Sequence, residues 1–228
     1  QTALSPLTPT TQFGQWWEHV IRHIDIVDSN LWVGLSTWQG RDGGMVKYNS
    51  TTGAIVDVIE AVGSVDDVKT LTLPSGEYMV AYNDHMFRHL DASGGLIATY
   101  DSSQTIVEIR TMKVHGDIVY FATDDGITRY DHVNRTWLST WTASNVFAGN
   151  GEDVRSLEII DSILYVGRQY WYGGAIDLIH PNGTTVTTIA LTQNGQRGIA
   201  TDFVKCGSDV FASINRIQWD RQSRLRLM

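Results

Sequence analysis

Hydrophobic and polar residues alternate along the chain in short runs, and the runs recur in a fixed order. The run "LWVG" is preceded by "HVIRHIDIV" and followed by "GMVKYN" and "AIVDVIE". Runs rich in Val, Ile, Thr, Trp and Tyr, separated by Gly, Asn, Asp and Ser, are typical of β-strands joined by tight turns. The pattern predicts antiparallel strands throughout. It favours a strand over a helix for "QWWEHVIRHI", because the second half of that stretch aligns with the first run of each unit.

This four-run unit occurs five times. Its second run begins, at intervals of 41 to 47 residues, at Leu31, Tyr78, Val119, Leu164 and Val210. Four strands in a repeat of this length are the sequence signature of a β-propeller blade, because stacked sheets cover each other's faces. We therefore predict an all-β fold, with a linker or N-terminal tail over residues 1–17 and a β-propeller over residues 18–228. The expected blades are about 18–63, 64–103, 104–150, 151–194 and 195–228.

Three of the units show a family resemblance. The stretches "NLWVGL…GGMVKYN", "DIVYFATDDGITRYD" and "SILYVGRQYWYGGAIDLI" resemble the propeller repeat of two-component-regulator sensors. The resemblance implies a blade and no particular activity. The second unit departs from it by lacking Gly after "YMVA", and the fourth by ending its third run in "LIHP". The fifth unit stops near its outer strand, so the chain is either a five-bladed ring or, as we favour, part of a larger ring.

Composition narrows the possible partners. The formal net charge of -8 and the pI near 5.2 argue against nucleic-acid binding. No apolar run reaches the roughly 18 residues of a membrane span, so direct membrane insertion is not expected. The single cysteine, Cys206, excludes an internal disulfide and is expected to be a half-buried strand residue. His85 and His89 on one strand would lie about 13 Å apart, too far to share a metal. We expect no metal site and no cofactor.

A charge pattern repeats in the first run of three units. It consists of the acid-base pairs Asp67 with Lys69, Glu108 with Arg110, and Asp153 with Arg155. Residues two apart in a strand share a face. The structural interpretation is a set of ion pairs that bridge neighbouring blades near the axis. The functional alternative is a charged ring lining a channel mouth that binds a ligand. Repetition favours the structural interpretation, since a site for one asymmetric ligand should differ from blade to blade.

Two units carry longer segments between their second and third strands than the compact unit "YFATDDGITRYD". These segments, "STWQGRDGG" and "RQYWYGG", are predicted to be aromatic-rich insertion loops. Their rings either cover a blade edge or form a platform for carbohydrate or peptide recognition, and binding residues concentrate on such loops. The predicted ligand-binding residues are Trp38, Arg41, Asp42, Arg168, Tyr170, Trp171 and Tyr172.

Three sequons begin at Asn49, Asn134 and Asn182, each in a predicted turn between the third and fourth strands. If they are glycosylated, the protein is exported and this rim faces solvent. The sequence thus favours a binding propeller of a secreted or cell-surface protein that does not catalyse, with a protein or carbohydrate ligand. One alternative is a glycoside hydrolase or lyase that uses carboxylates at the axial mouth, such as Asp67, Glu108 and Asp153. Another is a purely structural scaffold.

Overall fold

The structure is a computed structural model of the whole chain. It describes residues 19–27, 30–37, 42–62, 68–82, 86–92, 95–100, 109–142, 145–147, 153–170, 173–193, 196–216 and 222–227. Two compact units are formed, Gln1–Gln104 and Thr105–Met228. The stretch predicted as a strand rather than a helix contains the start of a strand, β1 (His19–Val27), which confirms that prediction.

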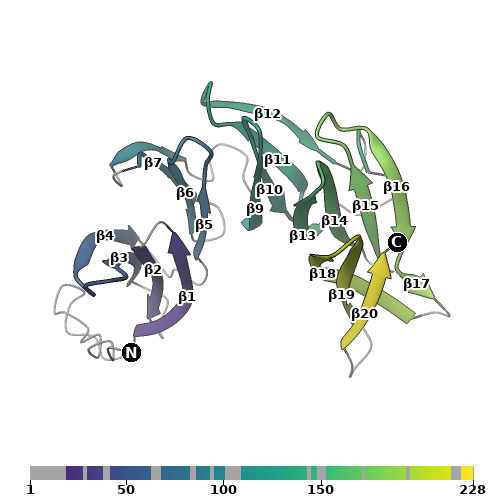
Figure 1. Cartoon of the computed structure of the whole chain (residues 1–228), viewed down its shortest axis with the longest axis horizontal. Helices are drawn as coiled ribbons and strands as arrows, with labels where there is room; N and C mark the ends of the chain where they lie inside the picture. The colour runs from purple at the N-terminus through teal and green to yellow at the C-terminus, as the bar shows by residue number, and fades with distance from the viewer. Residues whose placement is uncertain are drawn as a thin grey trace. The chain divides into compact units, whose positions relative to one another are not determined.

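The first unit contains two four-stranded antiparallel sheets, each built from consecutive strands (Figure 1). One sheet contains β1, β2 (Asn30–Thr37), β3 (Asp42–Asn49) and β4 (Ile55–Val62). The other contains β5 (Val68–Thr72), β6 (Tyr78–Tyr82), β7 (Met86–Leu90) and β8 (Leu96–Tyr100). Consecutive pairing of this kind needs short turns alone, which the Gly-, Asn- and Ser-rich segments provide.

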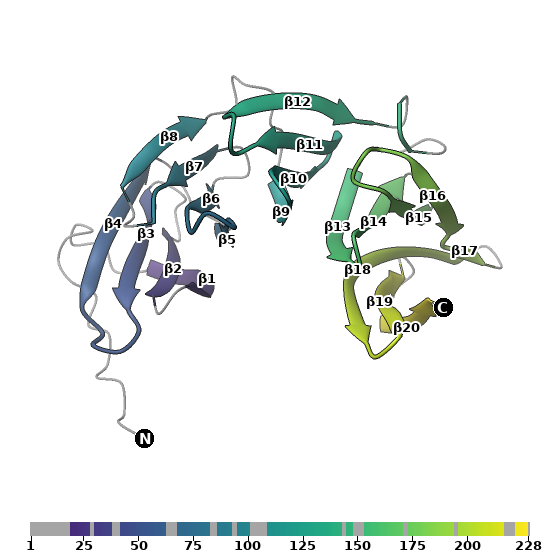
Figure 2. The same cartoon turned by 45° about the horizontal axis from the view of Figure 1, so that its top comes forward.

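The second unit contains three such sheets, and Figure 2 shows them in turn along the chain. The third sheet of the chain has β9 (Ile109–His115), β10 (Ile118–Thr123), β11 (Gly126–Asp131) and β12 (Thr136–Trp141). The fourth has β13 (Asp153–Ile160), β14 (Ile163–Tyr170), β15 (Gly173–Ile179) and β16 (Thr185–Ala190). The fifth has β17 (Thr192–Gln193), β18 (Gln196–Cys206), β19 (Asp209–Arg216) and β20 (Gln222–Leu227).

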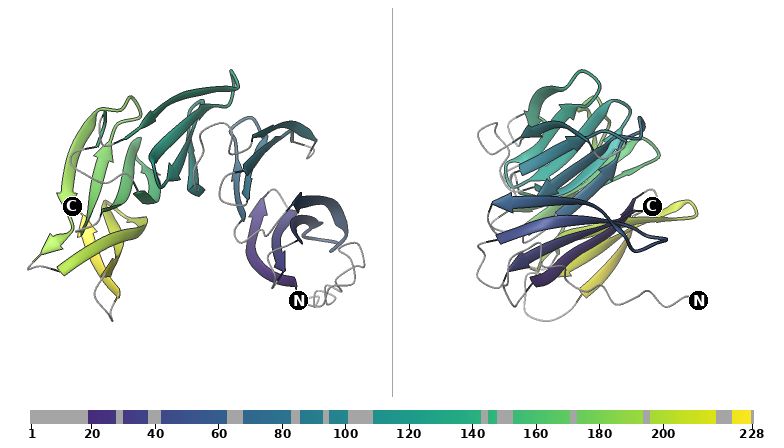
Figure 3. Two further views of the ribbon diagram at one scale, coloured as in Figure 1. Left: turned by 180° about the vertical axis from the view of Figure 1, so that it is seen from behind. Right: turned by 90° about the vertical axis from the view of Figure 1, so that its left-hand side faces the viewer.

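The hydrophobic core of the second unit lies between its sheets. One buried cluster joins the third and fourth sheets, and includes Tyr120, Trp141, Leu157 and Val166. A second cluster joins the fourth and fifth sheets, and includes Ile176 and Phe203. The fourth sheet, in which β13 to β16 are hydrogen-bonded in sequence order, is drawn in green in Figure 3. Each sheet therefore buries its apolar side chains against its neighbour and not within itself.

Close approach of two backbones requires glycine at one contact between the fourth and fifth sheets. A Cβ atom on Gly174 of β15 would lie 2.2 Å from the carbonyl oxygen of Gly198 in β18. Ser156 of β13 strengthens the same contact, because its hydroxyl donates a hydrogen bond to the Ala200 carbonyl oxygen at 2.7 Å. These contacts fix how β13 and β15 sit against β18, and so they position the strand ends described below.

Candidate binding surface

The fourth sheet places charged residues and Tyr170 at the same end of its strands. Asp153, the first residue of β13, is paired in register with Gln169 of β14, and Tyr170 is paired with Gly173 at the β14–β15 turn. Gln169 and Tyr170 are half-buried. We call this end of the sheet, with Arg110 and Arg155, the hairpin rim. It combines the predicted charged pattern with one of the two aromatic segments.

The charged residues of the hairpin rim form one connected group. Asp153 Oδ1 accepts a hydrogen bond from Arg110 Nε at 3.2 Å, across from β9 of the preceding sheet. Asp153 Oδ2 lies 2.5 Å from a terminal nitrogen of Arg155. The three side chains are 17%, 24% and 33% exposed for Arg110, Asp153 and Arg155. The Arg110 contact is therefore an ion pair between neighbouring sheets, and the Arg155 contact is the pair within one strand that the spacing suggests.

This geometry bears on the hydrolase alternative. Both carboxylate oxygens of Asp153 are held by guanidinium groups, so in this arrangement neither is free to accept or deliver a proton at a substrate. The other two carboxylates of that alternative, Asp67 and Glu108, lie outside the described residues. The distance between the carboxylates is therefore not described either. Lys69, the remaining member of the charged pattern, is half-buried in β5.

The predicted insertion loop of the fourth unit is wrong in one respect. Most of "RQYWYGG" belongs to strands, because β14 continues through Tyr170 and β15 begins at Gly173. The segment lengthens a hairpin whose counterpart in the third sheet, β10 and β11, is shorter. Strand pairing explains this extension, since Arg168, Gln169 and Tyr170 each have a register partner in β15.

Arg168 is not the exposed ligand contact that the sequence suggested. Its side chain is 1% exposed, and its Nε donates to Asp177 Oδ2. Asp177 is fully buried and also accepts a hydrogen bond from the Thr188 hydroxyl at 2.5 Å. The guanidinium lies 4.9 Å from the centre of the Phe147 ring. Arg168 therefore links β14 to β15 through Asp177, and Asp177 links β15 to β16 through Thr188. The sequence shows that an aspartate lies in the next strand, but nothing in it predicts that this aspartate pairs with Arg168.

The other predicted site residues are placed as follows. Asp42 is the first residue of β3, and no more than its backbone is described. Trp38, Arg41, Trp171 and Tyr172 lie outside the described residues. The two halves of the predicted ligand site belong to different units, the first to Gln1–Gln104 and the second to Thr105–Met228. The site that can be built from described side chains is therefore the hairpin rim of the fourth sheet.

In the fourth sheet, the sequon at Asn182 lies at the opposite end of the strands from the hairpin rim. Asn49 is the last residue of β3, and the turns after β11 and β15 carry Asn134 and Asn182. Asn182 Oδ1 accepts a hydrogen bond from the Thr184 backbone N–H at 2.9 Å, and Asn49 Oδ1 accepts one from the Thr51 backbone N–H at 3.0 Å. A modification at Asn182 would leave the hairpin rim uncovered, because the length of β15 separates the two ends of the fourth sheet.

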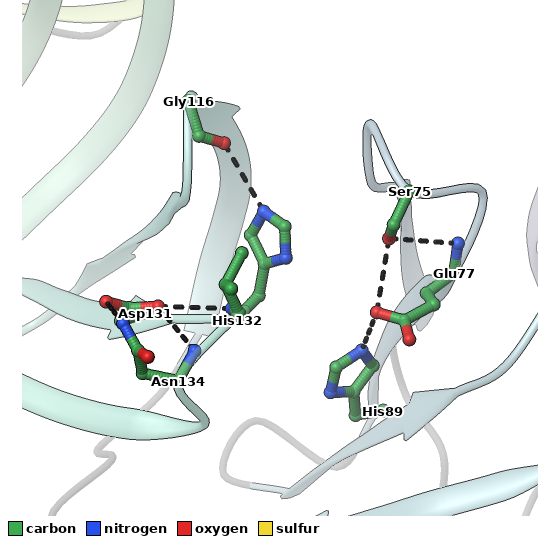
Figure 4. A network of polar contacts seen from close by, with 8 residues as sticks. Ser75, Glu77, His89, Gly116, Asp131, His132 and Asn134 are labelled. Carbon is green, nitrogen blue, oxygen red and sulfur yellow. Dashed lines mark hydrogen bonds and ion pairs between the residues drawn. The ribbon is translucent and has the colours of Figure 1, made fainter.

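Figure 4 shows the surroundings of Asn134 and of a buried histidine. Asn134 Nδ2 donates to Asp131 Oδ2 at 2.9 Å. Backbone and side-chain hydrogen bonds from Asn134 also hold the pKa of Asp131 below its ordinary value. His89 is fully buried, and its Nε2 lies 2.9 Å from Glu77 Oε2. These contacts give His89 a structural role, while His85 lies outside the described residues.

Three further findings complete the description. Cys206 is an exposed free cysteine at the end of β18, which corrects the expectation of a half-buried one. Among the described residues, no group of three His, Cys, Asp or Glu side chains is arranged to hold a metal ion. None of the described segments is a helix long and apolar enough to cross a membrane.

Comparison with known proteins places the fold. No protein-family model and no curated protein matches the chain. The structure is similar to BamB from Moraxella catarrhalis, with 19% sequence identity and a TM-score of 0.56 over 85% of this chain and 58% of that one. It is also similar to the Pan2 WD40 domain from Neurospora crassa, with 11% identity and a TM-score of 0.60 over 92% of this chain and 59% of that one.

These neighbours confirm the predicted all-β propeller fold. The chain spans less than two thirds of the length of either solved propeller, 58% and 59%. The narrower resemblance to two-component-regulator sensors is not confirmed, because both neighbours are propellers of other kinds. The residues that the structure describes form five four-stranded sheets of this kind.

Proposed function

We propose that this chain is a recognition module that binds a protein partner, in the form of a peptide segment, at the hairpin rim of its fourth blade. The observation that carries the proposal is the partly exposed group of Arg110, Asp153 and Arg155, at the end of the sheet where β14 ends in Tyr170. Arginine and tyrosine are enriched at the centres of protein interfaces, where a planar guanidinium and an amphipathic ring each make directed contacts. An anionic or amide-rich peptide suits this surface.

Two features support binding over catalysis. Asp153 is engaged through both oxygens by two guanidinium groups, which suits a preorganised contact surface and not a proton donor. The aromatic and charged residues stand on strand ends of a packed sheet, which holds them in fixed positions. Carbohydrate recognition is the second ligand class that the sequence suggested for the aromatic segments, and the same experiment tests it.

The test is an array measurement with peptides and glycans on the purified chain. Two variants remove rim contacts, Arg155→Ala and Tyr170→Ala. The matched control is Lys205→Ala, which removes an exposed cation paired with Asp161 at 2.6 Å at the other end of the strands. We expect selective peptide binding that each rim variant weakens about tenfold or more, and that the control leaves unchanged.

Other results would redirect the proposal. Glycan binding lost in the same variants would keep the site and change the ligand class. Binding that survives both rim variants, or no binding to either array with the fold intact by circular dichroism, would overturn the hairpin rim and leave a scaffold role.

An exported location belongs to the same proposal. It is supported by the three sequons, each of which begins at or just after the end of the third strand of its sheet, β3, β11 or β15. Secretion of the chain from a eukaryotic cell should give a mass reduced by glycosidase treatment, and Asn182→Gln should remove one increment. A secreted chain of unmodified mass would count against glycan attachment.

A further inference from the structure

One contact recurs between successive sheets of this chain. We call the first residue of each second run the second-strand anchor: Leu31, Tyr78, Val119, Leu164 and Val210. The residue that follows it is aromatic in four sheets, namely Trp32, Tyr120, Tyr165 and Phe211. In the first sheet the Trp32 ring lies 6.2 Å from the Tyr78 ring of the second. In the fourth sheet the Tyr165 ring lies 5.9 Å from the Phe203 ring of the fifth. In the third, the Tyr120 hydroxyl donates to the Pro181 carbonyl oxygen of the fourth at 3.2 Å.

This contact gives each sheet two different faces. We call the face that carries the aromatic residue the trailing face, and the face that receives it the leading face. The receiving residue is the second-strand anchor in the case of Tyr78, and an apolar residue of the first strand in the case of Phe203. We call the aligned apolar residues of the first strands, Ile24, Leu71, Met112, Leu157 and Phe203, the first-strand anchors. In the fourth and fifth sheets the first-strand anchors, Leu157 and Phe203, are 3% and 5% exposed. A covered leading face is therefore well buried.

The trailing face of the fifth sheet has the same residue pattern but is exposed. Phe211 occupies the aromatic position, and it is paired in register with Val204, so both share this face. Val204 is 58% exposed, and Phe211 is half-buried. Cys206, two residues beyond Val204 on the same strand face, is also exposed. The opposite face of this sheet is covered, since Val210 is 7% exposed.

The leading face of the first sheet is exposed along its innermost strand. Ile24 is the first-strand anchor, in the position that Phe203 holds in the fifth sheet, and it is 54% exposed. Ile26 shares its face and is 68% exposed. Farther out on the same face Val33, the register partner of Ile24, is 3% exposed. The exposed apolar surface of this face therefore lies along β1, at Ile24 and Ile26. The corresponding strand of the fifth sheet carries Phe203, which contacts Tyr165.

We propose that the trailing face of the fifth sheet in one copy packs on the leading face of the first sheet in a second copy. The chain carries both halves of its own recurring contact. One face has an aromatic residue with an adjacent valine, and the other has Ile24 at a receiving position with Ile26 on the same face. Pairing them removes apolar surface from water. Because the two faces differ, the association is head-to-tail.

Sedimentation velocity on the full chain over a wide range of concentration tests this interface. Val204→Glu places a carboxylate on the trailing face, and Ile26→Glu places one on the leading face. Both sites are exposed, so neither change disturbs the core. The matched control is Val133→Glu in the β11–β12 turn, where the valine is 60% exposed. We expect wild type and control to associate, and each face variant to associate at least about tenfold more weakly.

Mixing the two face variants distinguishes head-to-tail contact from contact between like faces. The Ile26→Glu chain keeps its trailing face, and the Val204→Glu chain keeps its leading face. Each alone should associate at least about tenfold more weakly than wild type, yet together they should form a one-to-one complex with wild-type affinity. If Ile26→Glu self-associates as strongly as wild type, its trailing faces pair with each other and the proposal is wrong. A monomeric wild-type chain at every concentration would overturn it as well.

Cys206 supplies an independent readout because it is the only cysteine in the chain. Its alkylation by a maleimide should slow as wild type associates, and in the mixture it should slow in the Ile26→Glu chain alone. Protection of Cys206 in a monomer would show that another part of the same chain covers the face, which would also overturn the contact between copies.

Discussion

Two buried cations of this propeller are accommodated in different ways. Arg168 in the second unit and Lys47 in the first are 1% and 3% exposed. Arg168 is paired with the buried carboxylate of Asp177. The Lys47 ammonium lies 5.1 Å from the centre of the Trp32 ring and 5.5 Å from that of Tyr78. Among the described side chains, Lys47 forms no ion pair.

The difference shows what each arrangement depends on. A buried ion pair concentrates the stabilisation of both charges in one contact, so losing either partner leaves a charge without compensation. Two aromatic faces share the stabilisation of an ammonium, and each contributes a smaller amount, up to about 2 kcal/mol when desolvated. Although Arg168 and Lys47 are similarly buried, substitutions around Arg168 in the fourth sheet should therefore destabilise the fold more than substitutions around Lys47 in the first sheet.

Asp177→Asn should produce the largest effect. It keeps the shape of the side chain but removes the charge that compensates Arg168, so we expect the free energy of unfolding to fall by about 3–5 kcal/mol. Urea denaturation measures the change. The matched control is Asp161→Asn, which breaks the exposed pair with Lys205 and should cost about 1 kcal/mol or less. Equal losses in the two variants would contradict the comparison.

Replacing both charges sharpens the same comparison. In Arg168→Met/Asp177→Leu no buried charge remains, and Thr188 is exposed, so its hydroxyl can turn to water. Apolar replacement of a buried pair is often neutral or stabilising, and we expect stability within about 1 kcal/mol of wild type. A double variant as unstable as Asp177→Asn would show that shape, and not the unpaired charge, dominates.

Lys47→Met should have a smaller effect than Asp177→Asn. Methionine keeps an unbranched chain between the two rings and makes favourable sulfur–aromatic contacts, while the buried charge disappears. The lost ammonium–ring attraction and the removed desolvation cost oppose each other, so we expect a change of about 1 kcal/mol or less. Urea denaturation monitored by tryptophan fluorescence reports on it. A loss as large as that of Asp177→Asn would mean that Lys47 has a charge partner.

Periodic features of the fold could be predicted from the sequence, and unique contacts could not. Strand runs and turn residues recur with every blade, so the five sheets were predictable, as was the position of the sequons in the turns between third and fourth strands. Whether "RQYWYGG" extends a hairpin or forms a loop depends on pairing with β15, which no periodicity reveals. The burial of Arg168 likewise depends on Asp177 and Phe147, whose positions follow from packing between strands and sheets.

A third cation gives the smallest effect, through pH. Arg129 is half-buried, with its guanidinium 4.4 Å from the centre of the Trp141 ring, and it faces Tyr120. Burial raises the pKa of Tyr120 above its ordinary value of 10.0, and the charge of Arg129 opposes that rise. The folded chain therefore holds the phenol proton at a pH where the unfolded chain has lost it. Hence the free energy of unfolding should decrease as pH rises above about 10.

Tyr120→Phe tests this dependence, because it removes the titrating group and leaves the ring. Burial also raises the pKa of Tyr48, so Tyr48→Phe is the matched variant in the first unit, and each should flatten part of the alkaline slope in urea denaturation. The Tyr120 hydroxyl also donates to Pro181, so Tyr120→Phe should lose about 1 kcal/mol at neutral pH, where Tyr120 is not ionised. An alkaline slope of the free energy of unfolding that is the same in Tyr120→Phe and wild type would contradict this prediction. It would mean that the charge of Arg129 cancels the effect of burial on the pKa of Tyr120.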